Sequence, residues 1–366
     1  MDKEYTRRLQ IIEAALGRWL PKNHDAQWLE AVFPGVSSRI SAASLETMIA
    51  PIKDLIARGG KRWRPLLMTL ICEALGGEDA SLPLVPLVEL CHNATLIHDD
   101  IEDNSDERRG LPAVHHIYGV DTAINSGSFL FFLPLVCVEA WAEELTEKGC
   151  YSNVQEYKNI IYKLWGEHMR KVHLGQAMDI NWHRNFSLIP DIEEYYFMCG
   201  LKTGCLASFA ATLGVHAACA AGAKIEHVDT VIAQFSEAAK KLGIGFQILD
   251  DVKNLSTGIP GKKRGDDVVE GKKSLPVLLY LHGNPDKHNF VNRCFSAAKT
   301  NGVNAPEVEE FIQTLTAGGF LDEAKEKGLA FIAQAREIFI SPQGINGFTM
   351  KAESSKLFDG FIQLIS

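Results

Sequence analysis

The sequence predicts an all-α protein, and the spacing of its apolar residues is the main reason. Over most of the 366 residues, apolar side chains recur at steps of three and four, which places them on one face of a helix. The clearest series is Ile232, Phe235, Ala239, Leu242, Phe246 and Leu249. Alternation of apolar and polar residues is scarce, so no segment needs to be a strand.

The helices that we expect are separated by short stretches rich in Gly, Pro and charged residues. In chain order, the expected helices cover residues 6–20, 43–58, 64–76, 84–103, 119–146, 153–179, 190–222, 228–254, 274–282, 286–299, 305–316, 320–338 and 350–365. The separating stretches include residues 57–65, 104–112, 256–267, 282–286 and 341–347. No repeat of fixed period and no obvious linker interrupts this order. We therefore expect one domain over residues 1–366, with residues 300–366 as peripheral C-terminal helices.

The composition is that of a globular protein with enough apolar material for a core. Hydrophobic residues make up 46% of the chain and charged residues 23%. The formal net charge of -9 disfavours nucleic acid, which binds to clusters of Lys and Arg. An acidic chain can still bind an anionic substrate, because basic residues or metal ions can reverse the local field.

The cysteines and the apolar segments predict a cytoplasmic protein. Eight cysteines are scattered singly and no CxxC pair occurs, which is typical of reduced thiols. The first ten residues are too polar for a signal peptide. The longest apolar run, residues 129–142, is too short for a membrane span and is interrupted by Pro134 and Glu139. We expect a soluble protein, not an integral membrane protein. The run suits an oligomer interface and the core equally.

The end of the expected helix 84–103 carries the first cluster of carboxylates. Asp99 and Asp103 lie one turn apart on one helix face, so their carboxylates can converge on one cation. Few hard oxygen ligands suit Mg²⁺, which keeps its waters and uses substrate phosphates for the rest of its shell. A solvated helix end would show the same residues, so this cluster alone leaves both interpretations open.

A second helix end repeats the design. In residues 243–254, Gln247, Asp250 and Asn254 share one face, and an apolar helix again ends in Asp-Asp. Two such helix ends could face each other across a helical bundle and hold metal between them. The repetition favours metal binding over two unrelated acidic helix ends.

Basic segments follow or precede these acidic clusters. GGKRWRP at 59–65 places Lys61 and Arg64 before a helix, where backbone can approach an anion closely. RRG at 108–110 follows the first cluster, and GKKRGDDVVEGKK at 261–273 follows the second. This combination suits polyphosphate held partly by metal and partly by Lys and Arg. The sequence contains no GxxxxGK[ST] or GxGxxG loop, so an ordinary nucleotide site is not indicated.

Together these motifs resemble those of the trans-isoprenyl diphosphate synthases. In chain order, they are GGKRWRP at 59–65, DDIED at 99–103, RRG at 108–110, GQAMDINW at 175–182, KTG at 202–204, FQILDD at 246–251 and GKKRGDDVVEGKKSLP at 261–276. A lone DDxxD is a weak signal, whereas seven ordered motifs over residues 55–280 are a strong one.

Within that family, the chain looks most like the eukaryotic-type geranylgeranyl diphosphate synthases. The segments that carry this likeness are CHNATLIHDDIED at 91–103, AINSGSFLFFL at 123–133 and DDVKNL at 250–255. Two departures from the broad family pattern agree with it. The second acidic motif ends in Asn254 where Asp is common, and Ser128 stands where many bacterial relatives have Asp. Asn254 removes one negative charge and is expected to weaken ion binding there.

The resemblance implies an isoprenoid-synthase helical bundle around a central cleft, three magnesium ions and a homodimer. Such enzymes ionise an allylic diphosphate, join its cation to isopentenyl diphosphate, and lose a proton, with release of diphosphate. Carried over by position, the expected direct metal ligands are Asp99, Asp103 and Asp250. The expected lesser or water-mediated metal ligands are Asp100, Asp251 and Asn254.

The resemblance also implies which residues bind the substrates. Arg108, Lys202 and Lys262 are expected to hold the allylic diphosphate. Lys61, Arg64, His92 and Arg109 are expected to hold isopentenyl diphosphate, and Lys272 is a further substrate-binding candidate. Thr203 and Gln247 are expected to stabilise the cation through their oxygen dipoles, and they complete a catalytic set with Lys202 and the three direct metal ligands. His92 lies about 10 Å along the helix from Asp99, which suits a second diphosphate beside a metal-bound one.

Small residues before the first acidic cluster predict a long product. Ala94 and Thr95 lie five and four residues before Asp99, where farnesyl-making relatives often place bulky aromatic residues. We therefore expect geranylgeranyl diphosphate or a longer product. Phe129, Phe131 and Phe132 are candidates for the floor that stops the chain.

Alternatives remain at this point. Within the fold, the chain could be a longer-chain polyprenyl synthase or a terpene cyclase, although cyclases commonly lack GGKxxRP. In a different class, it could be a non-catalytic partner subunit that regulates an active synthase. Degenerate acidic motifs would indicate such a subunit, but here the first is intact and the second keeps both leading aspartates. A plain metal- or phosphate-binding helical protein would not need the ordered motifs.

Overall fold

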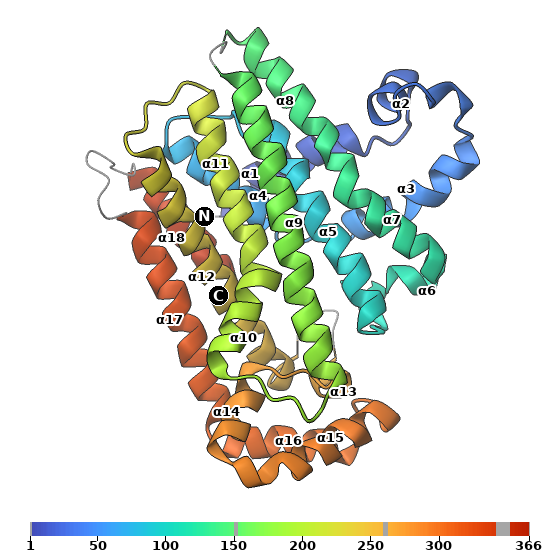
Figure 1. Ribbon diagram of the computed structural model, residues 1–366, viewed down its shortest axis with the longest axis vertical. Helices are drawn as coiled ribbons and strands as arrows, with labels where there is room; N and C mark the ends of the chain where they lie inside the picture. Colours follow the sequence, from blue (N-terminus) through green and yellow to red (C-terminus); the bar gives the residue numbers. More distant parts are fainter. Residues whose placement is uncertain (1, 150–152, 259–262, 342–351, 366) are drawn as a thin grey trace. The chain divides into compact units, whose positions relative to one another are not determined.

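The computed structural model describes residues 2–149, 153–258, 263–341 and 352–365, which Figure 1 shows as a helical protein. The prediction of an all-α fold is confirmed. The chain contacts divide into two compact units. Unit 1 consists of Met1–Gly166, Phe209–Phe235 and Ser341–Phe361, and unit 2 consists of Glu167–Ser208, Ser236–Ile340 and Ile362–Ser366. The expectation of one domain with a peripheral C-terminal part stays a prediction.

Unit 1 is built on the buried helix α5. Its own helices are α1 (Asp2–Trp19), α2 (Ala26–Val32), α3 (Ala42–Ala57), α4 (Trp63–Ala74), α5 (Val85–Glu102), α6 (Val114–Tyr118), α7 (Val120–Phe132) and α8 (Val136–Glu147), with short 3-10 turns at Ser37–Arg39, Leu82–Leu84 and Leu133–Leu135. Helix α5 packs most extensively against α7. Leu87, Leu90 and Ala94 are fully buried. This helix therefore fixes the position of the acidic residues at its C-terminal end.

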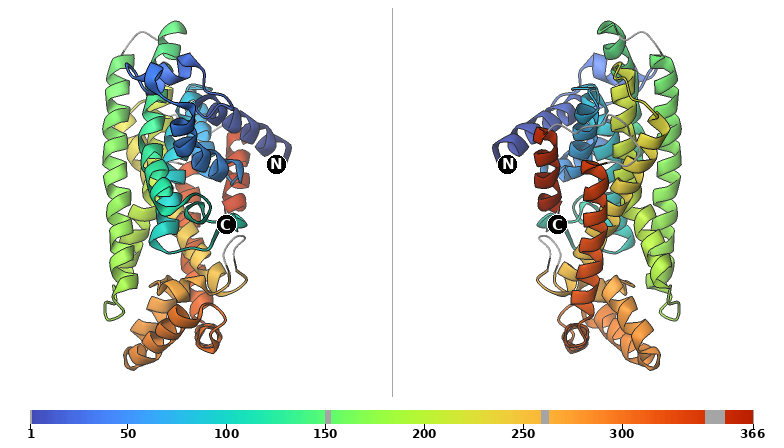
Figure 2. Two further views of the ribbon diagram at one scale, coloured as in Figure 1. Left: turned by 90° about the vertical axis from the view of Figure 1, so that its right-hand side faces the viewer. Right: turned by 90° about the vertical axis from the view of Figure 1, so that its left-hand side faces the viewer.

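Four further helices contain the positions at which the chain passes from one unit to the other. They are α9 (Val154–Arg184), α11 (Cys205–Ala220), α12 (Val228–Leu255) and α18 (Ala352–Ile365). Each of the four contributes residues to both units. Helix α9 has 31 residues and is the long helix at one edge of both views in Figure 2.

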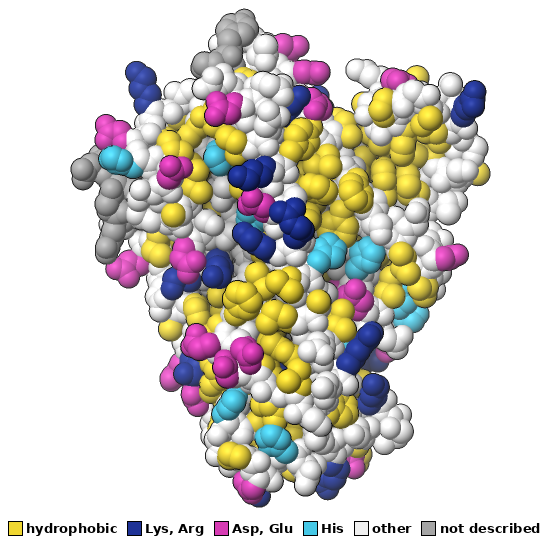
Figure 3. All heavy atoms as spheres, viewed as in Figure 1, with side chains coloured by type: hydrophobic (Ala, Val, Ile, Leu, Met, Phe, Trp, Pro, Cys, Tyr) yellow, Lys and Arg dark blue, Asp and Glu magenta, His cyan; other side chains and the backbone are white. Residues whose placement is uncertain are grey.

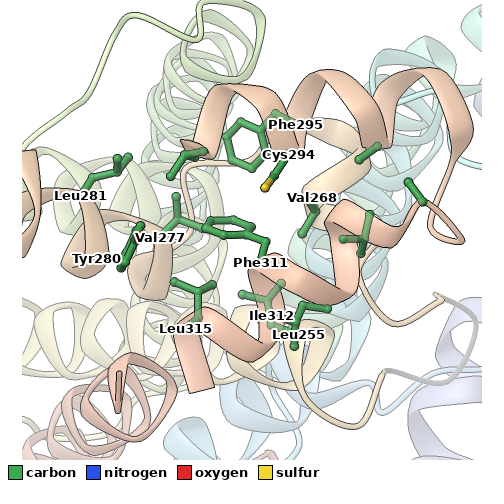
Figure 4. Close-up of a cluster of buried hydrophobic side chains, with 14 of the residues drawn as sticks. Leu255, Val268, Val277, Tyr280, Leu281, Cys294, Phe295, Phe311, Ile312 and Leu315 are labelled. Carbon is green, nitrogen blue, oxygen red and sulfur yellow. The ribbon is translucent and has the colours of Figure 1, made fainter. Parts of the chain in front are cut away.

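Unit 2 contains the remaining elements. They are α10 (Ile192–Cys199), a π-helical turn η4 (Gly200–Gly204), α13 (Asp266–Glu270), α14 (Leu275–Gly283), a 3-10 turn at Pro285–Lys287, α15 (His288–Asn301), α16 (Pro306–Ala317) and α17 (Phe320–Ile340). Figure 4 shows a core cluster in which Phe311 of α16 packs among residues of α14, α15 and the end of α12. Phe295 and Phe311 meet edge to face at a centroid distance of 5.8 Å. Burial of each such ring contributes about 1.5–3 kcal/mol to folding.

The structure contains two short strands that the sequence did not predict. Residues Glu107–Arg108 and Leu111–Pro112 form a two-stranded antiparallel hairpin, in which Arg108 pairs with Leu111. The two residues between the strands, Arg109 and Gly110, have φ of 55° and 76°. Two consecutive left-handed residues are the geometry of a tight hairpin turn. The RRG motif is therefore a turn that presents two arginines.

Two expected helices are interrupted. Pro134 lies in a 3-10 turn that separates α7 from α8, because proline cannot donate the helical hydrogen bond. The expected helix 190–222 contains the π-helical turn at Gly200–Gly204. The short helices α2, α6 and α13 were not expected, since each has seven residues or fewer.

Two helical stretches of the described chain pass a membrane-span test by length and composition alone. They are Val120–Glu147, whose window is 50% buried, and Ile192–Ala220, whose window is 94% buried. The apolar run 129–142, which we expected to be too short for a membrane span, lies inside the first stretch. The helical stretch as a whole has 28 residues and is long enough to pass the test. Core helices pass the same test, so the expectation about the membrane stays a prediction.

Candidate functional site

The C-terminal end of α5 presents the first acidic cluster. Asp103 caps the helix and donates its backbone N–H to the carbonyl of Asp99 at 2.9 Å. The side chain of Asp99 keeps 18% of its surface exposed, whereas that of Asp100 keeps 1%. The structure therefore leaves Asp99 accessible and turns Asp100 inward, as their helical positions predict.

Arg108 supplies the positive charge beside these carboxylates. Its Nε donates to Oδ1 of Asp100 at 2.8 Å, and its Nη2 lies 3.4 Å from Oδ2 of Asp99. Burial disfavours the charged guanidinium, but the charge of Asp100 and that of Asp99 outweigh burial and raise the pKa of Arg108. The hairpin arginine thus reduces the repulsion within the acidic cluster.

Arg58, at the C-terminal end of α3, holds the hairpin that carries Arg108. Its Nη1 donates to the carbonyl oxygens of Arg108 and Pro112 at 3.1 and 2.9 Å. Its Nη2 pairs with Asp54 at 2.8 Å, and its side chain is 2% exposed. Arg58 was not among the site residues predicted from the sequence. Its place directly before the Gly pair of GGKRWRP was the available signal.

A second basic group lies further toward the N-terminus of α5. Nη1 of Arg64 lies 3.3 Å from Nε2 of His92. Burial and the charge of Arg64 lower the pKa of His92 well below its ordinary value, so the imidazole is neutral. A neutral imidazole accepts a hydrogen bond on one nitrogen and donates on the other. Arg64 and His92 therefore offer neighbouring donors for an anion.

Arg109 lies against the Gly pair of the same region. A Cβ atom at Gly60 would lie 3.1 Å from Nη2 of Arg109, so glycine makes room for the guanidinium. Nη1 of Arg109 donates to the carbonyl of Leu55 at 3.0 Å. Burial lowers the pKa of Arg109 to about 10, and the positive charges of neighbouring arginines also lower it. Lys61 is exposed, and its carbonyl oxygen accepts a hydrogen bond from the hydroxyl of Tyr5.

Arg62 is a further residue that the sequence analysis missed. It has a left-handed backbone, with φ of 46°, at the start of α4. Its buried guanidinium pairs with Glu13 at 2.7 Å and with Glu89 at 2.9 Å. Glu89 lies on the same α5 face as His92, which was the available signal. Arg62 therefore ties the GGKRWRP loop to α5 and positions Lys61 and Arg64.

Unit 2 places Lys202 in the π-helical turn. Nζ of Lys202 pairs with Oδ2 of Asp179, from the GQAMDINW motif, at 2.5 Å. Burial opposes ionisation of Asp179, but Lys202 and Lys272 outweigh it and lower its pKa. A Cβ atom at Gly175 would lie 2.4 Å from the backbone nitrogen of Lys202, so this contact requires glycine. Asp179 was not among the expected site residues.

Thr203 begins a chain of side-chain hydrogen bonds. Its hydroxyl donates to Oε1 of Gln247 at 2.7 Å, and Nε2 of Gln247 donates to Oδ1 of Asp251 at 2.9 Å. The hydroxyl of Tyr195 donates to the other oxygen of Asp251 at 2.6 Å. Burial, together with the charge of Asp267, raises the pKa of Asp251 to about 7.

The remaining expected residues have separate surroundings. Asp250 is half-buried near the end of α12. Asn254 is 1% exposed, and its Oδ1 accepts from the backbone N–H of Asp267 at 3.2 Å. Lys272 pairs with Glu270 at 2.5 Å. Lys262 lies outside the described residues.

The acidic residues have the donor chemistry of a magnesium site. Within residues 2–149, 153–258, 263–341 and 352–365, no group of three or more His, Cys, Asp and Glu is close enough to hold a metal ion by itself. Magnesium sites for phosphate substrates commonly use one or two carboxylates, with water and phosphate oxygens as the other ligands. Asp99 and Asp103, one turn apart at an accessible helix end, fit that requirement.

Comparison with known proteins identifies relatives of the chain. The polyprenyl synthetase family model matches residues 46–314. A geranylfarnesyl diphosphate synthase of Aeropyrum pernix is 30% identical, over 89% of this chain and 93% of that protein. A geranylgeranyl pyrophosphate synthase of Apiospora sacchari is 33% identical, over 66% of this chain and 65% of that protein.

Solved structures agree with this result. A geranylgeranyl pyrophosphate synthetase from Pyrococcus horikoshii superposes with a TM-score of 0.76 at 25% identity, covering 99% of this chain and 98% of that one. A geranylgeranyl pyrophosphate synthase from Corynebacterium glutamicum, solved with isoprenyl diphosphate and magnesium, has a TM-score of 0.76 at 21% identity, covering 98% and 97%. The second likeness shows the fold alone.

Proposed function

Because the chain belongs to the polyprenyl synthetase family, we propose that it is a prenyltransferase that extends an allylic diphosphate with isopentenyl diphosphate. The observation that carries this proposal is the division of α5 into two anion-binding regions. Its acidic end is paired with Arg108, and His92, seven residues earlier, is paired with Arg64. Two diphosphates can therefore bind along one helix, about 10 Å apart.

We propose that Asp99, Asp103 and Asp250 are the direct ligands of magnesium, with three ions bound in all. Asp100, Asp251 and Asn254 already accept hydrogen bonds from protein groups, so any contribution of theirs to the metal would pass through water. Bound magnesium stabilises the negative charge that builds up on the leaving diphosphate.

The basic side chains hold the substrates in this proposal. Arg108, Lys202, Lys262 and Lys272 bind the allylic diphosphate. Lys61, Arg64, His92 and Arg109 bind isopentenyl diphosphate. The oxygen atoms of Thr203 and Gln247 stabilise the allylic cation. The departing diphosphate takes the proton, so the site needs no strongly basic side chain.

The product that we propose is geranylgeranyl diphosphate or a longer chain. Ala94 is fully buried within α5, and Thr95 donates its hydroxyl to the carbonyl of His92. Small side chains at these positions leave room for a prenyl tail. Among the floor candidates, Phe129 stacks on Phe33 and Phe131 stacks on His98. Phe132 is 59% exposed.

We also propose that the protein is a cytoplasmic homodimer. Figure 3 shows hydrophobic side chains gathered over the middle of the α7–α8 segment. Ile117, Val120, Ile124 and Phe132, from α6 and α7, are each at least 44% exposed. Such exposed apolar surface supports an interface. The described cysteines are free, which supports a reducing compartment.

One assay tests the proposed function. Purified protein is incubated with Mg²⁺, labelled isopentenyl diphosphate and, separately, dimethylallyl, geranyl and farnesyl diphosphate, and the products are sized. We expect Mg²⁺-dependent elongation to geranylgeranyl length or longer. Elongation with none of the starters would refute the synthase and favour the alternative, a non-catalytic partner subunit. Cyclic products would favour a terpene cyclase.

A further inference from the structure

A tyrosine outside the motifs ends the hydrogen-bond chain of unit 2. Tyr195 lies on α10 and is 1% exposed. Its hydroxyl donates to Oδ2 of Asp251 at 2.6 Å, while Oδ1 of Asp251 accepts from Nε2 of Gln247 at 2.9 Å. Gln247 in turn accepts from the hydroxyl of Thr203 at 2.7 Å. Four side chains from three elements are therefore connected in one sequence.

This chain has a defined direction. Oδ1 of Asp251 accepts from Nε2 of Gln247 while Oδ2 is held by Tyr195, so Asp251 keeps Gln247 in the orientation that turns its NH₂ group toward Asp251. The amide oxygen of Gln247 then faces Thr203 and must receive the hydroxyl hydrogen. A hydroxyl has one hydrogen and two lone pairs, so the lone pairs of Thr203 remain for another partner.

We propose that Tyr195 and Asp251 are positioning residues that hold Gln247 and Thr203 with their oxygen dipoles oriented for the allylic cation. This inference rests on the proposed function, since the cation is its target. Tyr195 acts by holding Asp251, and Asp251 acts by setting the orientation of the Gln247 amide. Neither residue touches the substrate.

The same geometry separates Asp251 from its neighbour Asp250. Both oxygens of Asp251 accept hydrogen bonds from side chains, and the residue is 5% exposed. Adjacent residues on an α-helix point about 100° apart. We assign Asp250, which is half-buried, as the metal ligand of the pair. The two consecutive aspartates therefore have different tasks.

The test compares Tyr195→Phe with Tyr196→Phe. Tyr196, the next residue of the same helix, packs its ring edge to face against Phe331 at 4.9 Å and serves as the matched control. Loss of one hydrogen bond that holds a reacting group in position costs about 10-fold in rate. We expect Tyr195→Phe to lower kcat by that factor, with KM for both substrates and the Mg²⁺ concentration for half-maximal rate unchanged. Tyr196→Phe should retain the wild-type rate, and equal losses in the two variants would overturn the proposal.

A double-variant cycle shows whether Tyr195 acts through Thr203. Thr203→Val removes the hydroxyl at nearly constant volume. If Tyr195 acts through that hydroxyl, Tyr195→Phe/Thr203→Val should be no slower than Thr203→Val alone. If the loss of rate in the double variant equals the product of the losses in the two single variants, Tyr195 does not act through Thr203.

Two measurements are independent of turnover. Calorimetry of Mg²⁺-dependent diphosphate binding should give wild-type affinity for Tyr195→Phe and Asp251→Asn, and weaker binding for Asp250→Asn. Weaker binding by Asp251→Asn, to the extent seen with Asp250→Asn, would make Asp251 a ligand and overturn the assignment. A crystal structure of Tyr195→Phe should show Gln247 displaced, and an unmoved Gln247 would overturn the relay. If wild-type protein forms no product, the proposed function fails, and these two measurements still decide on Asp251 and Tyr195.

Discussion

At the scale of single residues, several charged side chains of the candidate site have a defined partner, among them Arg108 and Lys202. Arg108 compensates for the carboxylates at the end of α5, which explains how an apolar helix can end in DDIED. From the sequence, we expected metal to be the compensating charge. The role of Arg108 could not be predicted, because the hairpin that brings Arg108 back to α5 depends on Arg58, from another helix.

Asp103→Asn should separate metal binding from folding. The variant removes a proposed magnesium ligand from an accessible helix end, so elongation should fall by about 100-fold or more. The thermal midpoint of the metal-free protein should change little. Asp106→Asn, at a nearby exposed aspartate, is the control and should retain activity. Full activity of Asp103→Asn would contradict the ligand assignment.

His216 should make the protein less stable in acid. Burial lowers the pKa of His216 to about 4 from 6.5, so the folded state holds the imidazole neutral while the unfolded state binds a proton below pH 6.5. Stability is therefore lost as pH falls from 6.5 toward 4, by about 2 kcal/mol at pH 5. Urea unfolding at pH 7.5 and pH 5 should show a smaller loss for His216→Leu than for the wild type. Equal losses would exclude His216 as the cause.

At the scale of elements, close helix contacts bring the motifs together. A Cβ atom at Gly243 of α12 would lie 2.5 Å from the Cα atom of Gly204 in the π-helical turn. Gly175 of α9 approaches the same turn at the backbone of Lys202. Short side chains therefore let α9 and α12 approach the turn that carries Lys202 and Thr203.

Gly243→Ala should destabilise the protein through this contact. The added methyl group meets backbone that cannot move alone, and such overpacking costs about 1–3 kcal/mol. Gly17→Ala is the matched control, since a Cβ atom there meets nothing within 4 Å and alanine should stabilise α1 by about 0.5–1 kcal/mol. Thermal unfolding of both variants measures the difference. A Gly243→Ala protein as stable as the wild type would show that the contact is not required.

The helices were predictable from the sequence, whereas several local features were not. The periodicity that predicted helix 228–254 reflects the burial of Phe235, Ala239 and Leu242 in the structure. The π-helical turn at Gly200–Gly204 gives no such signal, since it changes the hydrogen bonding of the backbone and keeps the apolar pattern. Candidate residues could be identified by motif, but their partners, such as Asp179 for Lys202, come from distant segments.

At the scale of the whole molecule, both units carry residues to which we assign roles in the proposed reaction. Unit 1 carries Asp99, Asp103 and Arg108, and unit 2 carries Asp250 and Lys202. In each unit, an apolar helix carries aspartates near its C-terminal end. We propose that both sets act in one prenyl-transfer reaction, because the chain belongs to the polyprenyl synthetase family.

Product length should respond to bulk at Ala94. Replacing Ala94 with Leu and then Phe should shorten the main product stepwise, because larger side chains fill the space proposed for the prenyl tail. Ala94 is fully buried, so thermal midpoints must accompany the product analysis. A folded Ala94→Phe protein with the wild-type product profile would show that the size of residue 94 does not determine product length.

Mass spectrometry of the product from farnesyl diphosphate and isopentenyl diphosphate tests whether the protein elongates an allylic diphosphate. Wild-type protein with Mg²⁺ should form geranylgeranyl diphosphate or a longer homologue. Asp103→Asn of unit 1 and Asp250→Asn of unit 2 should each lose that product. Failure of the folded wild-type protein to form any elongated diphosphate would contradict the account.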